Sequence, residues 1–285
     1  MGEPMIRNLA RSGVATHVID TDRRRLEALA AEPGVVTHGS LGDLATCATA
    51  ICMLPNSEAV AEVVAGPGGL LRVLPAGSVI IDMGSSRPSS TVALAEQARE
   101  AGMDLVDAPV SGGVSRARSA TLTIMFGGAR EQLDASAPLL ERLGSKVVHV
   151  GPVGAGHAMK ALNNVSSAIS LTAAVEILRV GRSLGLDAEV MLDVLNESTG
   201  RTYATEHKVR EFILSGTYAS GFAFHLMVKD LDTAMDMARN AGVPVGLGER
   251  CWELWKAAAP ALPESADHTE IARFIQGPDL TSEGR

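Results

Sequence analysis

The sequence is poor in aromatic residues, in cysteine and in net positive charge, and each shortage excludes a class of protein. Phe, Trp and Tyr make up 3% of the 285 residues and the net charge is −8, so we expect no basic, ring-lined surface for nucleic acid. The three cysteines, Cys47, Cys52 and Cys251, form no CxxC pair and are typical of reduced thiols in a cytoplasmic protein. The seven histidines lack the spacing of a zinc motif, and we expect no metal site.

Hydrophobic residues are plentiful but do not gather into long runs. They make up 46% of the chain, and the mean hydropathy of +0.16 is sufficient for folded cores. No uninterrupted apolar run reaches the 18 or so residues that a membrane-spanning helix needs. The N-terminus has no basic segment followed by an apolar one, so we expect no secretory signal. The sequence therefore predicts a soluble cytoplasmic protein, long enough for two domains.

The first half of the chain alternates short β-branched runs with amphipathic stretches. The predicted strands are 17–20, 35–37, 50–54, 78–83, 104–107, 121–126 and 146–150. Predicted helices between them include 23–31, 89–101 and 130–143. This alternation predicts an α/β fold with a doubly wound, mostly parallel sheet of the Rossmann type, covered on both faces.

The pattern changes after Gly151-Pro152. From residue 156 to 184 there is no proline and no strand-like run, and Gly185 follows as a C-cap, so one helix of about 29 residues is predicted. Further helices are predicted at 188–197, 204–214, 225–240, 247–258 and 268–275. We therefore predict two domains, an NAD-binding Rossmann-like domain at 1–152 and an all-helical domain at 153–285.

The N-terminus has the order of a dinucleotide-binding βαβ unit entered at its last glycine. Gly2 opens a helix, and the next strand ends at Asp20, but the first strand and the first two glycines of G-x-G-x-x-G do not appear. Eighteen residues separate Gly2 from Asp20, close to the spacing of about 20 for the acid that bonds the adenosine ribose. A carboxylate there repels a 2′-phosphate, which favours NAD over NADP. The alternative is that Asp20 simply caps a strand.

A serine followed by two glycines comes after the predicted strand 104–107. The backbone N–H groups of Gly112 and Gly113 could converge on an anion, with the Ser111 hydroxyl as a further donor. An ordinary turn is the alternative.

Polar side chains also follow the domain junction. Lys160, Asn163 and Asn164 lie at i, i+3 and i+4, which places them on one face of the long helix. Spacing alone would equally describe a solvated surface, but the row occupies the first turns after the junction, where clefts form. Lys229 and Asp230 are adjacent near the start of a later helix and, alone, would be read as a surface pair.

Taken together, these segments resemble the β-hydroxyacid dehydrogenase family, which includes 3-hydroxyisobutyrate dehydrogenase and tartronate semialdehyde reductase. The resemblance covers essentially the whole chain and rests on several motifs in the family's order. They are Met53-Leu-Pro-Asn-Ser57, Ile81-Asp-Met-Gly-Ser85, Asp107-Ala-Pro-Val-Ser-Gly-Gly113, Gly151-x-x-Gly-Ala-Gly156 with Lys160-x-x-Asn-Asn164, and Lys229-Asp230-Leu231. At two positions the chain departs from the family's pattern, because Gly84 replaces a usual serine or threonine and Ala120 a usual glycine.

The resemblance implies roles for these residues. Lys160 is the catalytic acid/base, and Asn164 helps to hold the reacting oxygen, with Asn163 as the alternative on the same helix face. The implied substrate-binding residues are Ser111, Gly112, Gly113 and Asn163. The implied cofactor-binding residues are Gly2, Asp20, Leu54, Pro55, Ser85, Lys229 and Asp230.

We therefore expect an enzyme that uses NAD, in preference to NADP, to interconvert a small 3-hydroxy acid and its semialdehyde, with 3-hydroxyisobutyrate or tartronate semialdehyde as the type of substrate. Arg116 and Arg118, just beyond the carboxylate loop, would favour a second anionic group on the substrate unless both face solvent. The resemblance also implies a homodimer or homotetramer. The alternative, suggested by the absent first strand, is a non-catalytic homologue that dimerises or binds a small acid without turnover.

Overall fold

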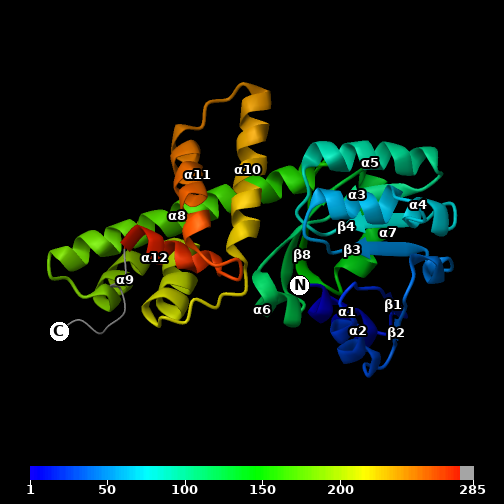
Figure 1. The fold of residues 1–285 in the computed structure, drawn as a ribbon, viewed down its shortest axis with the longest axis horizontal. Helices are drawn as coiled ribbons and strands as arrows, with labels where there is room; N and C mark the ends of the chain where they lie inside the picture. The colour runs from blue at the N-terminus through cyan, green and yellow to red at the C-terminus, as the bar shows by residue number, and fades with distance from the viewer. Residues whose placement is uncertain (277–285) are drawn as a thin grey trace. The chain divides into compact units, whose positions relative to one another are not determined.

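The computed structural model describes residues 1–276, so the end of the predicted domain 153–285 lies outside the described residues. The chain divides into unit 1, Met1–Lys160, and unit 2, which begins at Ala161. Helix α8, Ala155–Ser183, starts in unit 1 and continues into unit 2 (Figure 1). The boundary predicted after residue 152 therefore lies just before this helix.

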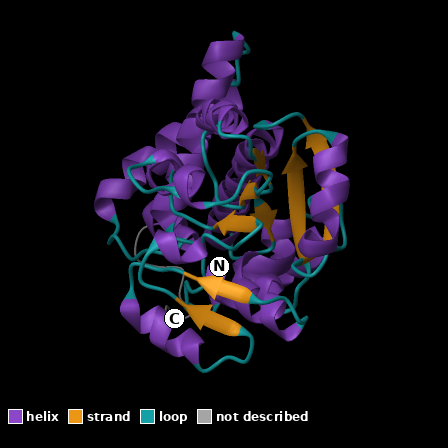
Figure 2. Ribbon diagram, turned by 90° about the vertical axis from the view of Figure 1, so that its right-hand side faces the viewer, coloured by secondary structure: helices purple, strands orange, loops and turns teal. Residues whose placement is uncertain are grey.

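Unit 1 contains two sheets (Figure 2). The smaller one pairs β1 and β2 in parallel, and the larger one has the order β3-β4-β5-β7-β6, with β8 added to β7. In the larger sheet β3, β4 and β5 are parallel, whereas β7 runs antiparallel to β5 and β6. The strands are β1 Thr16–Val18, β2 Val35–Thr37, β3 Thr49–Cys52, β4 Val79–Asp82, β5 Asp104–Asp107, β6 Val110–Ser111, β7 Leu122–Gly127 and β8 Gly144–Gly151.

The larger sheet is buried on both faces, as its apolar central strands predict. Ile80 and Ile81 of β4 are fully buried and belong to different clusters. Ile80 packs in the cluster of Val60 and Leu94, whereas Ile81 packs in that of Met5. The helical elements are α1 Gly2–Arg11, α2 Arg23–Ala30, η1 Leu41–Leu44, α3 Ser57–Ala65, α4 Leu70–Val73, α5 Pro88–Glu100, α6 Gly113–Arg118 and α7 Arg130–Leu140. The predicted α/β class is confirmed.

The regular elements in the described residues of unit 2 are all helical, apart from one isolated β-bridge between Ala223 and Asp267. Its core contains the fully buried Trp255, stacked on Phe224 with ring centroids 5.0 Å apart. The segment predicted as a helix at 204–214 is a π-helix. The elements after α8 are α9 Ala188–Asn196, η2 Ala204–Leu214, α10 Phe224–Ala241, α11 Gly246–Ala258, η3 Ala259–Ala261, η4 His268–Glu270 and α12 Ile271–Gln276.

Candidate active site

Two loops at the carboxyl ends of β3 and β4 lie against each other. Leu54 and Pro55 follow β3, and Gly84 and Ser85 follow β4. A Cβ atom on Gly84 would lie 2.9 Å from the Leu54 carbonyl oxygen, so the loops approach too closely for a larger residue at position 84. The departure from serine or threonine at this position therefore has a steric reason. The carboxyl ends of parallel strands are where doubly wound sheets bind dinucleotides, and three predicted cofactor residues meet there.

The start of α1 reaches the same region. A Cβ atom on Gly2 would lie 3.8 Å from Met53, the residue before the β3 loop. Helix α1 has no side-chain cap on its first N–H groups within the described residues, and such an N-terminus favours a phosphate group. These elements fit a nicotinamide dinucleotide, although the sequence has only one of the three fingerprint glycines.

Asp20 lies two residues after β1, which ends at Val18 and not at Asp20 as predicted. Its Oδ1 accepts a hydrogen bond from the Asp22 N–H at 2.8 Å, and its Oδ2 lies 3.5 Å from Arg25 Nη1. The predicted ribose-binding carboxylate thus also holds the turn into α2 and pairs with an arginine. Both readings of Asp20 in the sequence, as a cap and as a ligand-binding residue, are compatible with this geometry.

The beginning of α8 is fixed to the end of β5 by a buried carboxylate. Asp107 Oδ1 accepts from the Gly154 N–H at 2.6 Å, and Oδ2 accepts from the His157 N–H at 2.7 Å. A Cβ atom on Gly156 would lie 2.7 Å from the same Oδ2, so glycine is needed for this close approach. Burial raises the pKa of Asp107, although the nearby His157 and both N–H donors oppose that rise. Lys160 follows one turn later, half-buried.

His157 extends this anchor to the loop after β4. Its Nδ1 lies 2.8 Å from Thr91 Oγ1, and its Nε2 lies 3.7 Å from Asp82 Oδ2. Asp82 also holds its own loop. Its Oδ1 accepts a hydrogen bond from the Gly84 N–H at 2.9 Å, and its Oδ2 accepts one from Ser86 Oγ at 2.6 Å. A buried polar network therefore joins the β4 loop to the helix that carries Lys160. Sequence reasoning missed its members, although an acid ends both strands involved.

The predicted carboxylate-binding turn leaves the sheet at β6. Ser111 is half-buried and pairs with Thr123 of β7. Gly112 and Gly113 follow with φ of +130° and +68°, a region that favours glycine. The Arg116 side chain lies over this turn, because a Cβ atom on Gly112 would be 2.5 to 3.0 Å from its aliphatic carbons. One of the two predicted arginines thus borders the turn, with both side chains exposed.

Unit 2 brings four of the predicted residues together. Asn164 is 5% exposed and donates through Nδ2 to Asp230 Oδ2 at 2.5 Å. Asn163 Nδ2 donates to Asn164 Oδ1 at 3.2 Å, and Lys229 Nζ lies 3.4 Å from Asp230 Oδ1. Asp230 is buried, so this carboxylate orients the Asn164 amide. The row continues along α8 from Lys160, one turn earlier on the same helix face.

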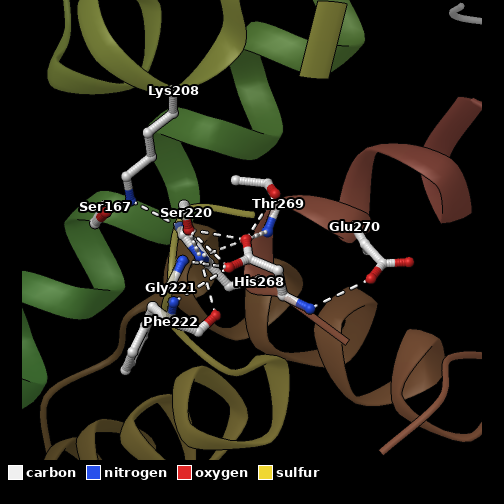
Figure 3. Close-up of polar contacts among 9 residues, drawn as sticks. Ser167, Lys208, Ser220, Gly221, Phe222, His268, Thr269 and Glu270 are labelled. Carbon is white, nitrogen blue, oxygen red and sulfur yellow. Dashed lines mark hydrogen bonds and ion pairs between the residues drawn. The ribbon is translucent and has the colours of Figure 1, made fainter. Parts of the chain in front are cut away.

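A second polar cluster in unit 2 surrounds the carboxylate of Asp267, and Figure 3 labels its other members, such as Ser220 and Thr269. Asp267 accepts from Ser220 Oγ at 2.8 Å, and Ser220 also lies 2.9 Å from His268 Nδ1. Lys208 Nζ lies 2.8 Å from His268 Nε2. Serine, histidine and aspartate here do not form a nucleophilic relay, because serine and aspartate both face Nδ1 while the lysine occupies Nε2. The cluster fixes η4 to the chain before α10 and to η2.

Among the described residues, no group of three His, Cys, Asp or Glu could hold a metal ion.

Comparison with known proteins gives consistent matches along the chain. Residues 1–151 match the family model described as the NAD binding domain of 6-phosphogluconate dehydrogenase. Residues 154–275 match the one described as NAD-binding of NADP-dependent 3-hydroxyisobutyrate dehydrogenase.

Individual relatives span most of the chain. The chain is 39% identical to 2-(hydroxymethyl)glutarate dehydrogenase of Eubacterium barkeri over 86% of this chain and 81% of that protein. It is 32% identical to 3-hydroxyisobutyrate dehydrogenase of Pseudomonas aeruginosa, over 98% and 96%. A solved structure of Mycobacterium tuberculosis 3-hydroxyisobutyrate dehydrogenase with L-serine superposes with a TM-score of 0.85 at 29% identity, over 97% and 96%.

A doubly wound sheet with loops of this kind, followed by a long helix with a lysine–asparagine row and further helices, is typical of a class of nicotinamide-dependent dehydrogenases. The two family models and the relatives show which family within this class the chain resembles. This chain belongs to the β-hydroxyacid dehydrogenase family.

Proposed function

We propose that the protein is an NAD-dependent dehydrogenase that interconverts a small 3-hydroxy acid and its semialdehyde, with Lys160 as the acid/base. The observation that carries this proposal is the pair of hydrogen bonds by which the Asp107 carboxylate holds the first turn of α8. Asp107 ends the strand that leads to Ser111, so the same residue sets the positions of the carboxylate-binding turn and of the lysine helix. Two chemical functions that must act on one small molecule are thereby held by one rigid element.

The chain's own residues would orient the substrate and move one proton. The Ser111 hydroxyl and the N–H groups of Gly112 and Gly113 bind the substrate carboxylate. Bound nicotinamide supplies or accepts the hydride at the carbon that carries the reacting oxygen. In the reductive direction the Lys160 ammonium stabilises the growing negative charge on that oxygen and donates the proton. In the oxidative direction neutral Lys160 accepts the hydroxyl proton.

The polar row of unit 2 would complete the environment of that oxygen. The Asn164 amide, oriented by Asp230, has a second N–H that can donate to the reacting oxygen. Asn163, whose Nδ2 donates to Asn164 Oδ1, is the alternative on the same helix face. Lys229 pairs with Asp230 and is assigned to the cofactor side on the strength of the family alone.

The preference for NAD over NADP rests on Asp20. Its carboxylate would accept hydrogen bonds from both ribose hydroxyls and repel a 2′-phosphate. The adjacent Arg25 is the residue that would weaken this preference if it turned to a phosphate instead. Dissociation constants for NADH and NADPH, measured by nicotinamide fluorescence, test the assignment, and tighter binding of NADPH would contradict it.

The decisive experiment replaces the lysine. Lys160→Ala should lower kcat for semialdehyde reduction by about 10²- to 10⁴-fold, the usual range for a lost general acid, while the Kd of NADH stays within about twofold. Lys146→Ala, an exposed lysine on β8, is the matched control and should retain full activity. If Lys160→Ala kept most of its turnover, the assignment of the acid/base would be wrong. If the wild-type chain bound no NADH and oxidised none of the hydroxy acids compared below, the non-catalytic alternative would replace this proposal.

Arg116 and Arg118 are both exposed, but the position of Arg116 over the turn still favours a substrate with a second carboxylate. Its side chain lies over Gly112, beside the turn assigned to the first carboxylate, and one relative acts, by its name, on 2-(hydroxymethyl)glutarate, a dicarboxylate. We therefore expect kcat/KM to be higher for 2-(hydroxymethyl)glutarate than for 3-hydroxyisobutyrate, L-serine or the alcohol of tartronate semialdehyde. Arg116→Ala should lower kcat/KM for the dicarboxylate at least tenfold, which corresponds to about 1.4 kcal/mol. It should leave kcat/KM for the monocarboxylates unchanged. Arg130→Ala, an exposed arginine on α7, is the control, and equal losses on both classes would refute a second subsite.

A further inference from the structure

His157 is a buried titratable side chain that the proposed mechanism does not use. It is 1% exposed and lies on the first turn of α8, one turn before Lys160. Its ring lies between two buried carboxylates, with Nε2 3.7 Å from Asp82 Oδ2 and Nδ1 3.8 Å from Asp107 Oδ2. All of these residues belong to unit 1. The chemistry of this group depends on how many protons its three members hold.

Both carboxylates act as hydrogen-bond acceptors. Asp82 accepts from the Gly84 N–H and from the Ser86 hydroxyl, one on each oxygen. Asp107 accepts from two backbone N–H groups at the start of α8, again one on each oxygen. Such donors favour the ionised form of a carboxyl group. The ends of β4 and β5 therefore place two negative charges in the interior, where positive charge must offset them.

The hydrogen bond to Thr91 places a proton on Nδ1 of His157. Thr91 Oγ1 donates its own proton to the Arg87 carbonyl oxygen at 3.2 Å, so it is the acceptor toward Nδ1 at 2.8 Å. Nε2 then faces the Asp82 carboxylate. A lone pair on Nε2 would be repelled there, whereas a second proton is attracted, so this geometry favours an imidazolium.

The other titratable neighbours of this group have different states or roles. Cys52 is the register partner of Asp82 on β3, and burial together with Asp82 raises the pKa of its thiol to about 12, so the thiol is neutral. Burial also raises the pKa of Asp107, and the charge of His157 opposes that rise. Lys160 is the next cation along α8, and the proposed function places its charge at the reacting oxygen.

We infer that His157 is a positioning residue, a buried imidazolium whose charge holds the carboxylates of Asp82 and Asp107 together. It thereby sets the place of Lys160 relative to the loop after β4. Asp82 orders that loop, which contains Ser85, and Asp107 holds the helix turn before the lysine. The link to catalysis rests on the proposed function, whereas the charge on the ring does not. Loss of the charge would leave two buried carboxylates that repel each other.

The protonation state can be measured without any activity. Long-range proton–nitrogen NMR of the seven histidine rings distinguishes an imidazolium from either neutral tautomer. The signal that is absent from the His157→Gln spectrum belongs to His157. It should show both ring protons at pH 8, where a solvated histidine, with a pKa of about 6.5, is neutral. A neutral ring at that pH would overturn the inference.

The balance of charge gives a second test. At pH 7.5, His157→Gln should lower the urea midpoint followed by far-UV circular dichroism, because it leaves two carboxylates without the imidazolium. Asp82→Asn should lower the midpoint of the wild-type chain, since it removes one partner of the positive charge. In the His157→Gln chain the same change should instead recover at least half of the loss, since it removes one of two opposed negative charges. An effect of the same sign in both chains would contradict an imidazolium.

The positioning role has its own readout in turnover. His157→Gln should lower kcat for semialdehyde reduction at least tenfold, because Lys160 moves relative to the bound nicotinamide. The KM of the semialdehyde and the Kd of NADH should stay within about threefold, because the residues that bind these molecules are unchanged. His149→Gln, at an exposed position on β8 of the same unit, is the matched control and should keep the wild-type midpoint and kcat.

Failure of this inference and failure of the proposed function give different results. If the wild-type chain bound no NADH and turned over no substrate, the proposed function would fail, but the NMR spectrum and the urea midpoints would still decide the charge on His157. If Lys160→Ala abolished turnover while His157→Gln kept the wild-type kcat, the positioning role would be wrong and the acid/base assignment would stand. A lower kcat with an unchanged KM, together with a doubly protonated ring, is the result that supports both.

Discussion

At the scale of single residues, Ala120 stands in a backbone conformation that suits glycine. Its φ is +55°, and among the described non-glycine residues Tyr218 alone shares a positive φ. A left-handed conformation costs an alanine roughly 1–2 kcal/mol because its Cβ crowds the carbonyl oxygen. The resembling family usually has glycine at this position, so the departure noted in the sequence has an energetic cost in the turn between α6 and β7.

Ala120→Gly should therefore stabilise unit 1, because glycine adopts this conformation without strain. The greater entropy of glycine in the unfolded chain opposes part of the gain, which leaves about 0.5–1 kcal/mol. Urea unfolding followed by far-UV circular dichroism would measure the change. Ala93→Gly is the matched control, because Ala93 is exposed within α5, and it should lose about 1 kcal/mol. Loss of stability in both variants would show that the turn imposes no strain on Ala120.

The sequence predicted candidate site residues more readily than the residues that hold them in place. Gly112, Gly113 and the α8 row follow from local patterns and from the family resemblance. The anchor between Asp107 and His157 joins residues fifty positions apart, and no local pattern reports such a contact. A polar residue at a strand end has many ordinary explanations, so its importance emerges only when the fold buries it.

At the scale of elements, periodicity predicts the long helices well. Helix α8 was predicted at 156–184 and is found at Ala155–Ser183, because no proline or glycine turn interrupts the pattern. The two-residue strand β6 and the six-residue helix α6 were not predicted, since neither is long enough to repeat its pattern twice. The burial of one face of α8 and the exposure of the other also escaped prediction, because an apolar stripe at helical spacing is ordinarily core.

At the scale of the whole molecule, the two units respond to acid in opposite directions. In unit 2, burial lowers the pKa of His268, and the nearby Lys208 adds to this against the opposing Asp267. Burial would raise the pKa of Asp267, but hydrogen bonds from His268 and Thr269 outweigh it and hold that pKa well below its usual range. In unit 1, by contrast, the pKa of Asp107 is raised.

The signs of these shifts set the pH dependence of stability. A lowered pKa means that the unfolded chain binds the proton first, so unit 2 loses stability as the pH falls below the ordinary histidine pKa of about 6.5. Asp267 adds a further loss below about pH 4, the ordinary range of aspartate. A raised pKa has the opposite effect, because the folded state binds the proton more tightly, so Asp107 favours the folded state of unit 1 as the pH falls.

We therefore expect acid to weaken unit 2 before unit 1, and the two tryptophans provide a selective probe. Trp252 and Trp255 both lie in unit 2, whereas far-UV circular dichroism reports on both units. Between pH 7.5 and 4.5 the urea concentration at the midpoint of the fluorescence transition should fall. The urea concentration at which the circular dichroism transition is complete, which reports on unit 1, should fall less. His268→Gln should lower the fluorescence midpoint at pH 7.5 and flatten its dependence on pH, because the titrating group is gone. His225→Gln, at an exposed position on α10, is the control and should keep the wild-type profile. A His268→Gln profile as steep as the wild type would show that another group in unit 2 governs its response to acid.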